Sequence, residues 1–315
     1  MRLLKIGLLV FFLLYAVITY FVSSMIVKPP PRRTTARSAE ILMERWQIDL
    51  DSIEALLPER SQVDIESHDG LKLKGFLATA DQNQAAKCMI LLAHGYTDNQ
   101  SGTFKYAPLF DSCGCDLLMI NHRGHGLSEG ELVTGGVLEG LDLRRWHAFA
   151  QERSGLLASK IGWVGESWGA ASMLQAASGL DDPPAFLLAE SPYSTWDKAI
   201  SERAVRDFGP IVHFLLPGVY AWCRLRTGQW VGDADTQALV KDLKTPTLLI
   251  HSIADPDTYY EQSREIYESI PETTASELHL LDWGSHHVHS IYDRPEEYRE
   301  LFWGFVDREV AGFCE

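Results

Sequence analysis

The sequence predicts an α/β fold in which a mostly parallel sheet carries helices on both faces. Six continuous apolar runs indicate its strands, at 88–93, 116–120, 161–164, 185–189, 247–250 and 278–281. Such runs are typical of strands that are buried on both faces of a parallel sheet. Helical stretches accompany them, at 138–153, 168–179, 258–270 and 295–310. This alternation is the pattern of a layered α/β domain.

The N-terminal segment is expected to cross a membrane as a single helix. Residues 6–27 carry no charged side chain, and about 20 helical residues span a hydrocarbon core of ~30 Å. A cleaved signal peptide is the alternative, but its apolar region is usually about 7–15 residues long and ends in small residues. Tyr20, Phe21 and Val22 are too bulky for such a site. Residues 1–27 are therefore interpreted as an uncleaved membrane anchor.

The charges around this segment leave open which side of the membrane the body of the chain occupies. Two basic residues precede the apolar run, and four follow it, at Lys28, Arg32, Arg33 and Arg37. A count of Lys and Arg slightly favours a cytoplasmic body. The start of the chain is nevertheless typical of a signal anchor, which would export the body.

The five cysteines do not decide the compartment. Their number is odd, Cys88 lies in an apolar strand-like run, and Cys113 and Cys115 are separated by one residue. Redox and zinc motifs have two residues at that place. All five cysteines are interpreted as free thiols that serve as small core residues.

Two changes of composition divide the rest of the chain. Segment 28–38 is rich in proline and basic residues, so it is interpreted as an extended linker to a folded domain over 39–315. Between the strands that end at Glu190 and begin at Thr247, prolines and aromatic residues recur over more than 50 residues. This stretch is too long for a simple crossover, so a small helical lid is expected at about 192–245.

The first elements of the domain are a helix and a hairpin. Apolar periodicity predicts an amphipathic helix over 39–57, which Pro58 stops. Alternating segments 63–67 and 71–77 flank an Asp-Gly turn, so they predict a β-hairpin. An antiparallel hairpin that leads into parallel strands makes the sheet mixed.

Charge excludes one class of partner. The first 37 residues hold six basic side chains and no acidic one, which leaves 22 bases against 43 acids in the remainder. A body with a net charge of −21 repels phosphate backbones. Nucleic-acid binding is therefore not expected.

Polar residues follow three of the predicted strands, where the sites of parallel α/β sheets form. Segment 165–169 reads Gly-Glu-Ser-Trp-Gly between a strand and a helix of small residues. This G-x-S-x-G pattern is typical of a nucleophilic serine, here Ser167, on a strained turn whose glycines let strand and helix approach. The helix N-terminus directs N–H groups and a positive dipole end at the oxygen that becomes charged.

A serine hydroxyl needs a base, and the base needs an orienting acid. Asp255 and Asp257 follow the fifth predicted strand, and His286, His287 and His289 follow the sixth. The order serine, acid, histidine matches a known chain order of triad enzymes. A metal site at the three histidines is not expected, because no H-E-x-x-H motif or carboxylate cluster accompanies them.

These motifs together resemble the α/β-hydrolase superfamily over roughly residues 60–310. The matching pieces are His94–Thr97, Asn121–Gly130, Gly165–Gly169, His251–Asp255 and Gly284–His287. The chain is most similar to bacterial esterase/lysophospholipase-like and serine-aminopeptidase-like hydrolases that carry a small lid.

The resemblance implies a role for each matching residue. Ser167 matches the nucleophile and Asp255 the acid. The family usually has His-Gly at the strand end before the acid, whereas this chain has His251 and Ser252. Asp257 therefore remains a competitor for the acid.

The histidine is assigned by spacing within the family pattern. His287 lies three residues after Gly284 and eight before Pro295, as the family's histidine does. His286 is the alternative. The resemblance also implies that the backbone N–H groups of Tyr96 and Trp168 form the oxyanion hole.

The implied reaction is acyl transfer to water through an acyl-enzyme, without a cofactor or a metal. The anchor and the aromatic lid favour lipophilic carboxylic esters as substrates. A peptidase or amidase and a thioesterase are the alternatives, because one triad serves all of these reactions. The non-enzyme alternative is a membrane-tethered binding protein on an inactive hydrolase fold.

Overall fold

The computed structural model describes residues 2–29, 34–46, 60–80, 85–284 and 286–315. Within these residues one sheet has the order β1-β2-β4-β3-β5-β6-β7-β8. Its strands are β1 (Arg60–Glu66), β2 (Lys72–Ala78), β3 (Cys88–Ala93), β4 (Cys115–Ile120), β5 (Ile161–Glu166), β6 (Phe186–Glu190), β7 (Thr247–Ser252) and β8 (Ser276–Leu281). β2 pairs antiparallel with β1 and β4, and the other pairs are parallel. The predicted mixed, mostly parallel sheet is confirmed.

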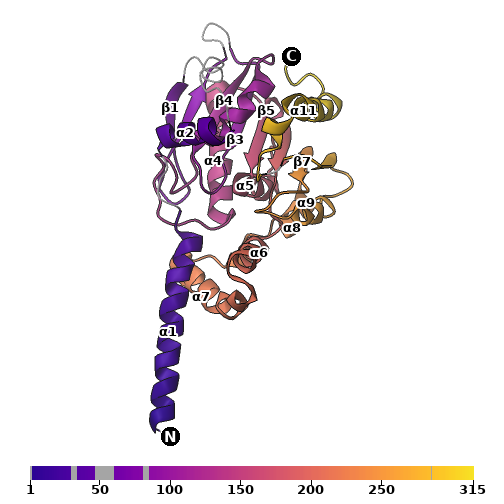
Figure 1. Cartoon of the computed structure of the whole chain (residues 1–315). Coiled ribbons are helices and arrows are strands. Elements are labelled where there is room, and N and C mark those ends of the chain that lie inside the picture. Colours follow the sequence, from indigo (N-terminus) through magenta and orange to yellow (C-terminus); the bar gives the residue numbers. More distant parts are fainter. Residues whose placement is uncertain (1, 30–33, 47–59, 81–84, 285) are drawn as a thin grey trace.

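Helices surround this sheet (Figure 1). The α-helices are α1 (Arg2–Val27), α2 (Thr35–Trp46), α4 (Val137–Ser154), α5 (Trp168–Ala177), α6 (Trp196–Phe208), α7 (Leu216–Thr227), α8 (Thr236–Leu239), α9 (Tyr260–Tyr267), α10 (Ser290–Asp293) and α11 (Pro295–Glu309). Short 3₁₀ segments are η1 (Gln100–Phe110), η2 (Ala158–Lys160), η3 (Pro210–Phe214), η4 (Val231–Asp233) and η5 (Val240–Asp242). The sequence predicted no element at η1.

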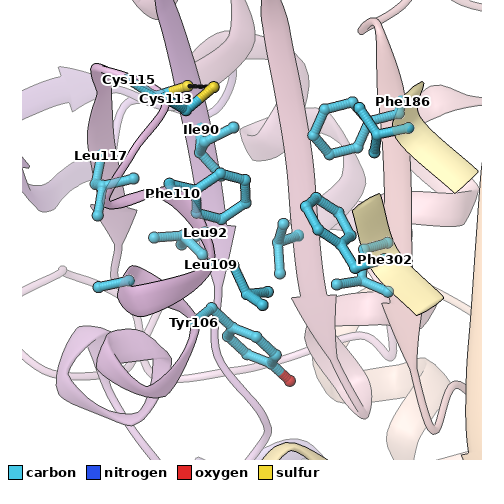
Figure 2. Close-up of a cluster of buried hydrophobic side chains, with 14 of the residues drawn as sticks. Ile90, Leu92, Tyr106, Leu109, Phe110, Cys113, Cys115, Leu117, Phe186 and Phe302 are labelled. Carbon is cyan, nitrogen blue, oxygen red and sulfur yellow. Dashed lines mark hydrogen bonds between the residues drawn. The ribbon is translucent and has the colours of Figure 1, made fainter. Parts of the chain in front are cut away.

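The core lies in two layers, because side chains alternate between the faces of a buried strand. On β3, Ile90 and Leu92 pack in the layer covered by η1 and α11, whereas Met89 and Leu91 pack against α4 and α5. Figure 2 shows part of the first layer, with Phe302 of α11 among its aromatic side chains. The helices therefore cover both faces, as predicted.

The helix expected over 39–57 begins earlier, at Thr35, and so takes up the end of the linker expected over 28–38. Thr34 explains the earlier start, because its hydroxyl oxygen accepts a hydrogen bond from the backbone N–H of Arg37 at 3.1 Å. A threonine in this position caps a helix N-terminus. Residues 47–57 of the expected helix lie outside the described residues.

The prediction of five free thiols is wrong. Disulfides join Cys88 to Cys115 and Cys113 to Cys314, and Cys223 is a buried free thiol. The cause is tertiary: Cys88 and Cys115 are register partners at the amino ends of parallel strands β3 and β4. The chain end returns to the same edge of the sheet. The spacing of the cysteines in the sequence cannot show that Cys88 lies close to Cys115, or Cys113 close to Cys314.

The helix α1 projects away from the body for half of its length (Figure 1). Its residues from 2 to 14 are exposed. The other end is fixed, because the hydroxyl of Tyr96 donates to the carbonyl oxygen of Lys28 at 2.7 Å, and the N–H of Val133 donates to that of Val27 at 2.8 Å. By length and composition α1 could cross a membrane, and a signal sequence has the same properties.

The segment between β6 and β7, where a lid is expected, is largely helical and includes α6, η3 and α7. It lies beside the upper part of α1 in Figure 1. Val219 and Cys223 of α7 join one buried cluster with Val27 of α1 and Trp168 of α5. This cluster connects the N-terminal helix, the helical segment between β6 and β7, and the turn that carries Ser167.

Candidate active site

Ser167 lies at the turn between β5 and α5, with φ 51° and ψ −119°. A positive φ is unfavourable for a residue that has a side chain, so the packing around the turn must hold it. A Cβ at Gly165 would lie 2.9 Å from the Cα of Ala170, and one at Gly169 would lie 2.5 Å from the carbonyl oxygen of Ala93. Both positions therefore need glycine for β5, α5 and β3 to approach one another.

His287 lies between Ser167 and Asp255. Its Nε2 is 2.6 Å from Ser167 Oγ, and its Nδ1 is 2.7 Å from Asp255 Oδ2. An ionised carboxylate only accepts hydrogen bonds, so Nδ1 carries the proton and Nε2 is left to accept from the serine hydroxyl. The loops after β5, β7 and β8 thus bring together the three side chains that the resemblance selected.

The two competitors lie elsewhere. The carboxylate of Asp257 pairs with the guanidinium of Arg206 on α6 at 2.7 Å. The ring of His286 packs against that of His289, with centroids 5.3 Å apart. Geometry therefore distinguishes Asp255 and His287 from their neighbours in sequence.

The loop after β7 holds Asp255 in an ionised state. Its Oδ1 accepts hydrogen bonds from the backbone N–H groups of Asp257 at 2.9 Å and Thr258 at 3.1 Å. Burial alone would raise the pKa of Asp255, but His287 and His251 lower it well below its usual range. His251, the penultimate residue of β7, thus favours the ionised form of the Asp255 carboxylate.

The opposite shift occurs at His287. Burial would lower its pKa, but the negative charge of Asp255 and their hydrogen bond raise it above the ordinary value, with smaller contributions from Asp257 and Glu166. A histidine in such surroundings holds a proton more strongly than a free imidazole. This property is required of a group that takes a proton from a hydroxyl and later returns it.

The two residues expected to form an oxyanion hole flank the serine. Trp168 opens α5, and the N–H groups of a first helical turn have no partner within the helix. Tyr96 follows Gly95, where an added Cβ would lie 3.5 Å from the Cβ of Ser167. The rings of Tyr96 and Trp168 pack edge to face, with centroids 5.6 Å apart.

Sequence reasoning missed a buried ion pair beside the serine. Lys105 Nζ lies 2.5 Å from Glu166 Oε2 and donates to the carbonyl oxygen of Val288 at 2.8 Å. Glu166 Oε1 accepts from the backbone N–H of Gly95 at 3.0 Å. The pair therefore connects three loops: the one after β3, the turn at Ser167, and the loop that carries His287. The sequence does contain a signal for this ion pair, because Glu166 lies inside the G-x-S-x-G motif and a buried carboxylate needs a cation.

Two clusters of the described residues have the composition of a metal site. One consists of cysteines that are engaged in the disulfides. The other is His68, Asp69 and Asp142, but the guanidinium of Arg123 lies 3.0 Å from Asp69 and 2.7 Å from Asp142. Arg123 thus occupies the place of a cation between these carboxylates.

An open cleft of about 530 Å³ lies between α6 and the segment after β7. Its lining includes the charged side chains of Lys198, Glu202 and Glu265, the side chains of Ile253, Tyr259 and Tyr260, and Asp255. Ser167 and His287 are not among its lining residues. The cleft therefore meets the three-residue arrangement at Asp255.

Comparisons with known proteins agree with this architecture. A model of the alpha/beta hydrolase fold family matches residues 89–296. The uncharacterized protein YqkD of Bacillus subtilis is 26% identical over 250 residues, which cover 79% of this chain and 80% of that protein.

Two solved structures show the same fold. The Pyrococcus furiosus esterase Pf2001 has a TM-score of 0.69 and 22% identity, over 90% of this chain and 99% of that one. The Pyrococcus horikoshii acylaminoacyl peptidase has a TM-score of 0.63 and 21% identity, over 81% of this chain and 42% of that one. Together with the family match, the sheet order and the turn at Ser167 lead to one conclusion: the chain belongs to the alpha/beta hydrolase family.

Proposed function

We propose that the protein is a membrane-anchored serine hydrolase that cleaves lipophilic carboxylic esters. The observation that carries this proposal is the position of His287, which bonds Ser167 Oγ through one ring nitrogen and Asp255 through the other. A serine hydroxyl becomes an effective nucleophile only when a base is in hydrogen-bond reach and a third group orients that base. The buried, ionised carboxylate of Asp255 supplies the orientation.

The proposed reaction has two steps. In the first, His287 Nε2 takes the proton of Ser167 while Oγ attacks the ester carbonyl, and the N–H groups of Tyr96 and Trp168 stabilise the oxyanion. The imidazolium then protonates the departing alcohol, which leaves an acyl-enzyme. In the second step His287 takes a proton from water as the water oxygen attacks the acyl carbonyl. Ser167 Oγ then leaves and receives that proton back from His287, which releases the carboxylic acid and restores the free enzyme.

The direct test is hydrolysis of p-nitrophenyl esters from C2 to C16 by the full chain, beside p-nitroanilides and thioesters of the same acyl groups. We expect the esters to react fastest and the longer acyl chains to be preferred. Faster cleavage of the anilides would identify a peptidase or amidase, and faster cleavage of the thioesters a thioesterase. An absence of turnover and of fluorophosphonate labelling at Ser167 would favour the binding protein.

The raised pKa of His287 predicts the pH dependence of this activity. The base must be neutral, so kcat/KM should rise with pH through a value above the ordinary 6.5 of histidine. In Asp255→Asn the pKa of His287 should fall, because the variant loses the negative charge that raises it. The acid limb should then move to lower pH while kcat decreases by about 10³–10⁴-fold. A limb that stays in place would argue that another group is titrating.

The disulfides bear on the side of the membrane that the charges left open. Disulfides persist in oxidising compartments and are rare where thiols are kept reduced. We therefore place the body outside the cytoplasm, with the Arg2 end of α1 inside. This orientation is that of a signal anchor, and it is opposite to the one that the count of basic residues slightly favours.

Counting thiols in the chain as isolated from bacterial membranes checks this placement. Denatured without a reductant, the protein should react with one maleimide-polyethylene glycol, at Cys223. After reduction all five cysteines should react. Five additions without the reductant would contradict both the disulfides and the exported body.

A further inference from the structure

The tip of the lid has the composition of a membrane segment. From Phe208 to Cys223 there are 16 consecutive residues without Asp, Glu, Lys or Arg. Several of its large side chains face outward: Phe208 is 65% exposed, Ile211 73% and Phe214 56%. Outward-facing apolar side chains that lie close together, here at the end of α6 and on η3, mark an interaction surface.

This surface is continuous with the helix that could cross a membrane. The rings of Phe214 and Tyr15 lie 5.3 Å apart. Gly218 of α7 makes the approach of the two helices possible, because a Cβ there would lie 2.6 Å from Tyr15 and 2.9 Å from Thr19. Small residues at such crossings are typical of helices that pack within membranes.

The contacts between α7 and α1 continue toward the C-terminal ends of both helices. Trp222 Nε1 donates to the carbonyl oxygen of Ala16 at 3.1 Å, and Arg226 donates to the hydroxyl of Ser23 at 3.0 Å. The contacts thus advance from Tyr15 to Ser23 as α7 advances from Gly218 to Arg226, so the two helices run side by side in the same direction.

The length of α1 determines how deeply the contact between α1 and α7 lies in the membrane. The freely exposed residues 2–14 form a helix of roughly 20 Å, too short for a hydrocarbon core of ~30 Å. Because Arg2 and Lys5 are charged and stay outside the hydrocarbon, a spanning helix must immerse at least about seven more residues, from Tyr15 to Phe21. The beginning of α7 packs against these residues, so the lid tip enters the membrane whenever α1 spans it.

Backbone polar groups at the lid tip have hydrogen-bond partners within the protein, which suits a medium without water. An unsatisfied peptide group is costly in hydrocarbon. The hydroxyl of Tyr15 donates to the carbonyl oxygen of Phe214 at 3.0 Å and accepts from the N–H of Gly218 at 3.2 Å. Pro210 and Pro217 have no N–H to satisfy.

Charged residues on both sides of the lid tip mark where the inserted segment ends. Arg206 and Asp207 precede the uncharged run, and Arg224 and Arg226 follow it. The guanidinium of Arg226 lies over the ring of Tyr20, 5.4 Å from its centroid. Arginine and tyrosine side chains are typical of the membrane–water interface.

From these contacts we infer that the lid tip, residues 208–223, is inserted in the bilayer leaflet next to the body and is held there by α1. The partner of this surface is the phospholipid bilayer. Trp168 and Val27 share a buried cluster with α7, so the turn at Ser167 lies close to the membrane surface. Resting on the proposed esterase function, this placement makes acyl esters that reside in the bilayer the substrate class.

The experiment compares Ile211→Cys with Leu157→Cys in the full chain, reconstituted in phosphatidylcholine vesicles. Leu157 is 74% exposed, almost the same as Ile211, but it precedes β5 at the opposite end of the sheet. Both variants carry an environment-sensitive fluorophore on the new thiol. Lipids with a nitroxide on the acyl chain should quench the label at position 211 and leave the label at position 157 unquenched.

Equal quenching at the two positions would overturn the inference. Cross-linking between copies at position 211 without quenching would also overturn it, because a second copy would then cover this surface. Quenching needs no catalysis, so the same result is expected in a Ser167→Ala background. Failure of the proposed enzyme function would therefore leave this readout intact, and the two failures are distinguishable.

A second readout connects the surface to substrate. Ile211→Glu should reduce hydrolysis of an ester embedded in the vesicles by at least about tenfold, because a carboxylate resists entry into hydrocarbon. Hydrolysis of water-soluble p-nitrophenyl acetate should remain unchanged. Leu157→Glu should leave both rates unchanged. An equal loss on both substrates in Ile211→Glu would show general damage and contradict a role in membrane access.

Discussion

Ser167→Ala should reduce ester hydrolysis by about 10⁴-fold or more, since removal of a triad nucleophile leaves only oxyanion stabilisation and binding. The folded structure should change little. Ser167 bonds β6 through its backbone N–H, which donates to the carbonyl oxygen of Glu190 at 2.7 Å, and alanine keeps that bond. Turnover with a short soluble ester and labelling by a fluorophosphonate should both disappear.

His287→Ala and His286→Ala serve as a matched pair for the same assay. The two histidines are adjacent in the chain, but the one within 2.6 Å of Ser167 Oγ is His287. We expect a loss comparable to that of Ser167→Ala at position 287, and a small effect at position 286. The reverse outcome would move the base by one residue and would require a different conformation of this loop.

Lys105→Met should produce the largest loss of stability. The side chains of Lys105 and Glu166 are 4% and 5% exposed, and removing one partner of a buried pair leaves an uncompensated charge that costs about 3–5 kcal/mol of unfolding free energy. Burial already raises the pKa of Glu166, and Lys105 opposes this rise. Without the lysine, Glu166 should take up a proton or the turn should distort. Thermal unfolding in detergent measures the loss.

The double variant Lys105→Met/Glu166→Gln is the control. Glutamine removes the buried charge and keeps an acceptor for the N–H of Gly95, so most of the lost stability should return. Catalysis should not return fully, because the bond from Lys105 to Val288 is still missing beside His287. A misplacement of that imidazole by about 1 Å costs up to about 100-fold in rate. A single variant as stable as the double variant would contradict the role of the ion pair.

Local patterns were sufficient to predict the sheet and the three polar loops at its carboxyl edge. Buried parallel strands read as apolar runs, and G-x-S-x-G has a geometry of its own, which the φ of 51° at Ser167 shows. The choice of His287 over His286 came from spacing within a family, and the structure shows the physical difference between the two residues.

Contacts between distant parts of the chain could not be predicted. Cys314 approaches Cys113 across 201 residues, and Lys105 approaches Glu166 from a 3₁₀ segment that has no periodic signal. The helical segment between β6 and β7 was expected from its length and its prolines. Its packing against the N-terminal helix depends on Gly218, where a side chain would clash with that helix. The sequence alone does not show which residues Gly218 contacts, so this packing could not be predicted.

The bonds that fix the end of α1 also have a consequence for biogenesis. Proteases cut chain segments that are exposed and can unfold locally. Here the backbone at Val27 and Lys28 is tied to Val133 and Tyr96. In the folded protein these hydrogen bonds must open before a protease can bind the chain at this junction. The bonds at this junction should therefore protect the peptide bonds after α1 from a protease that acts after folding.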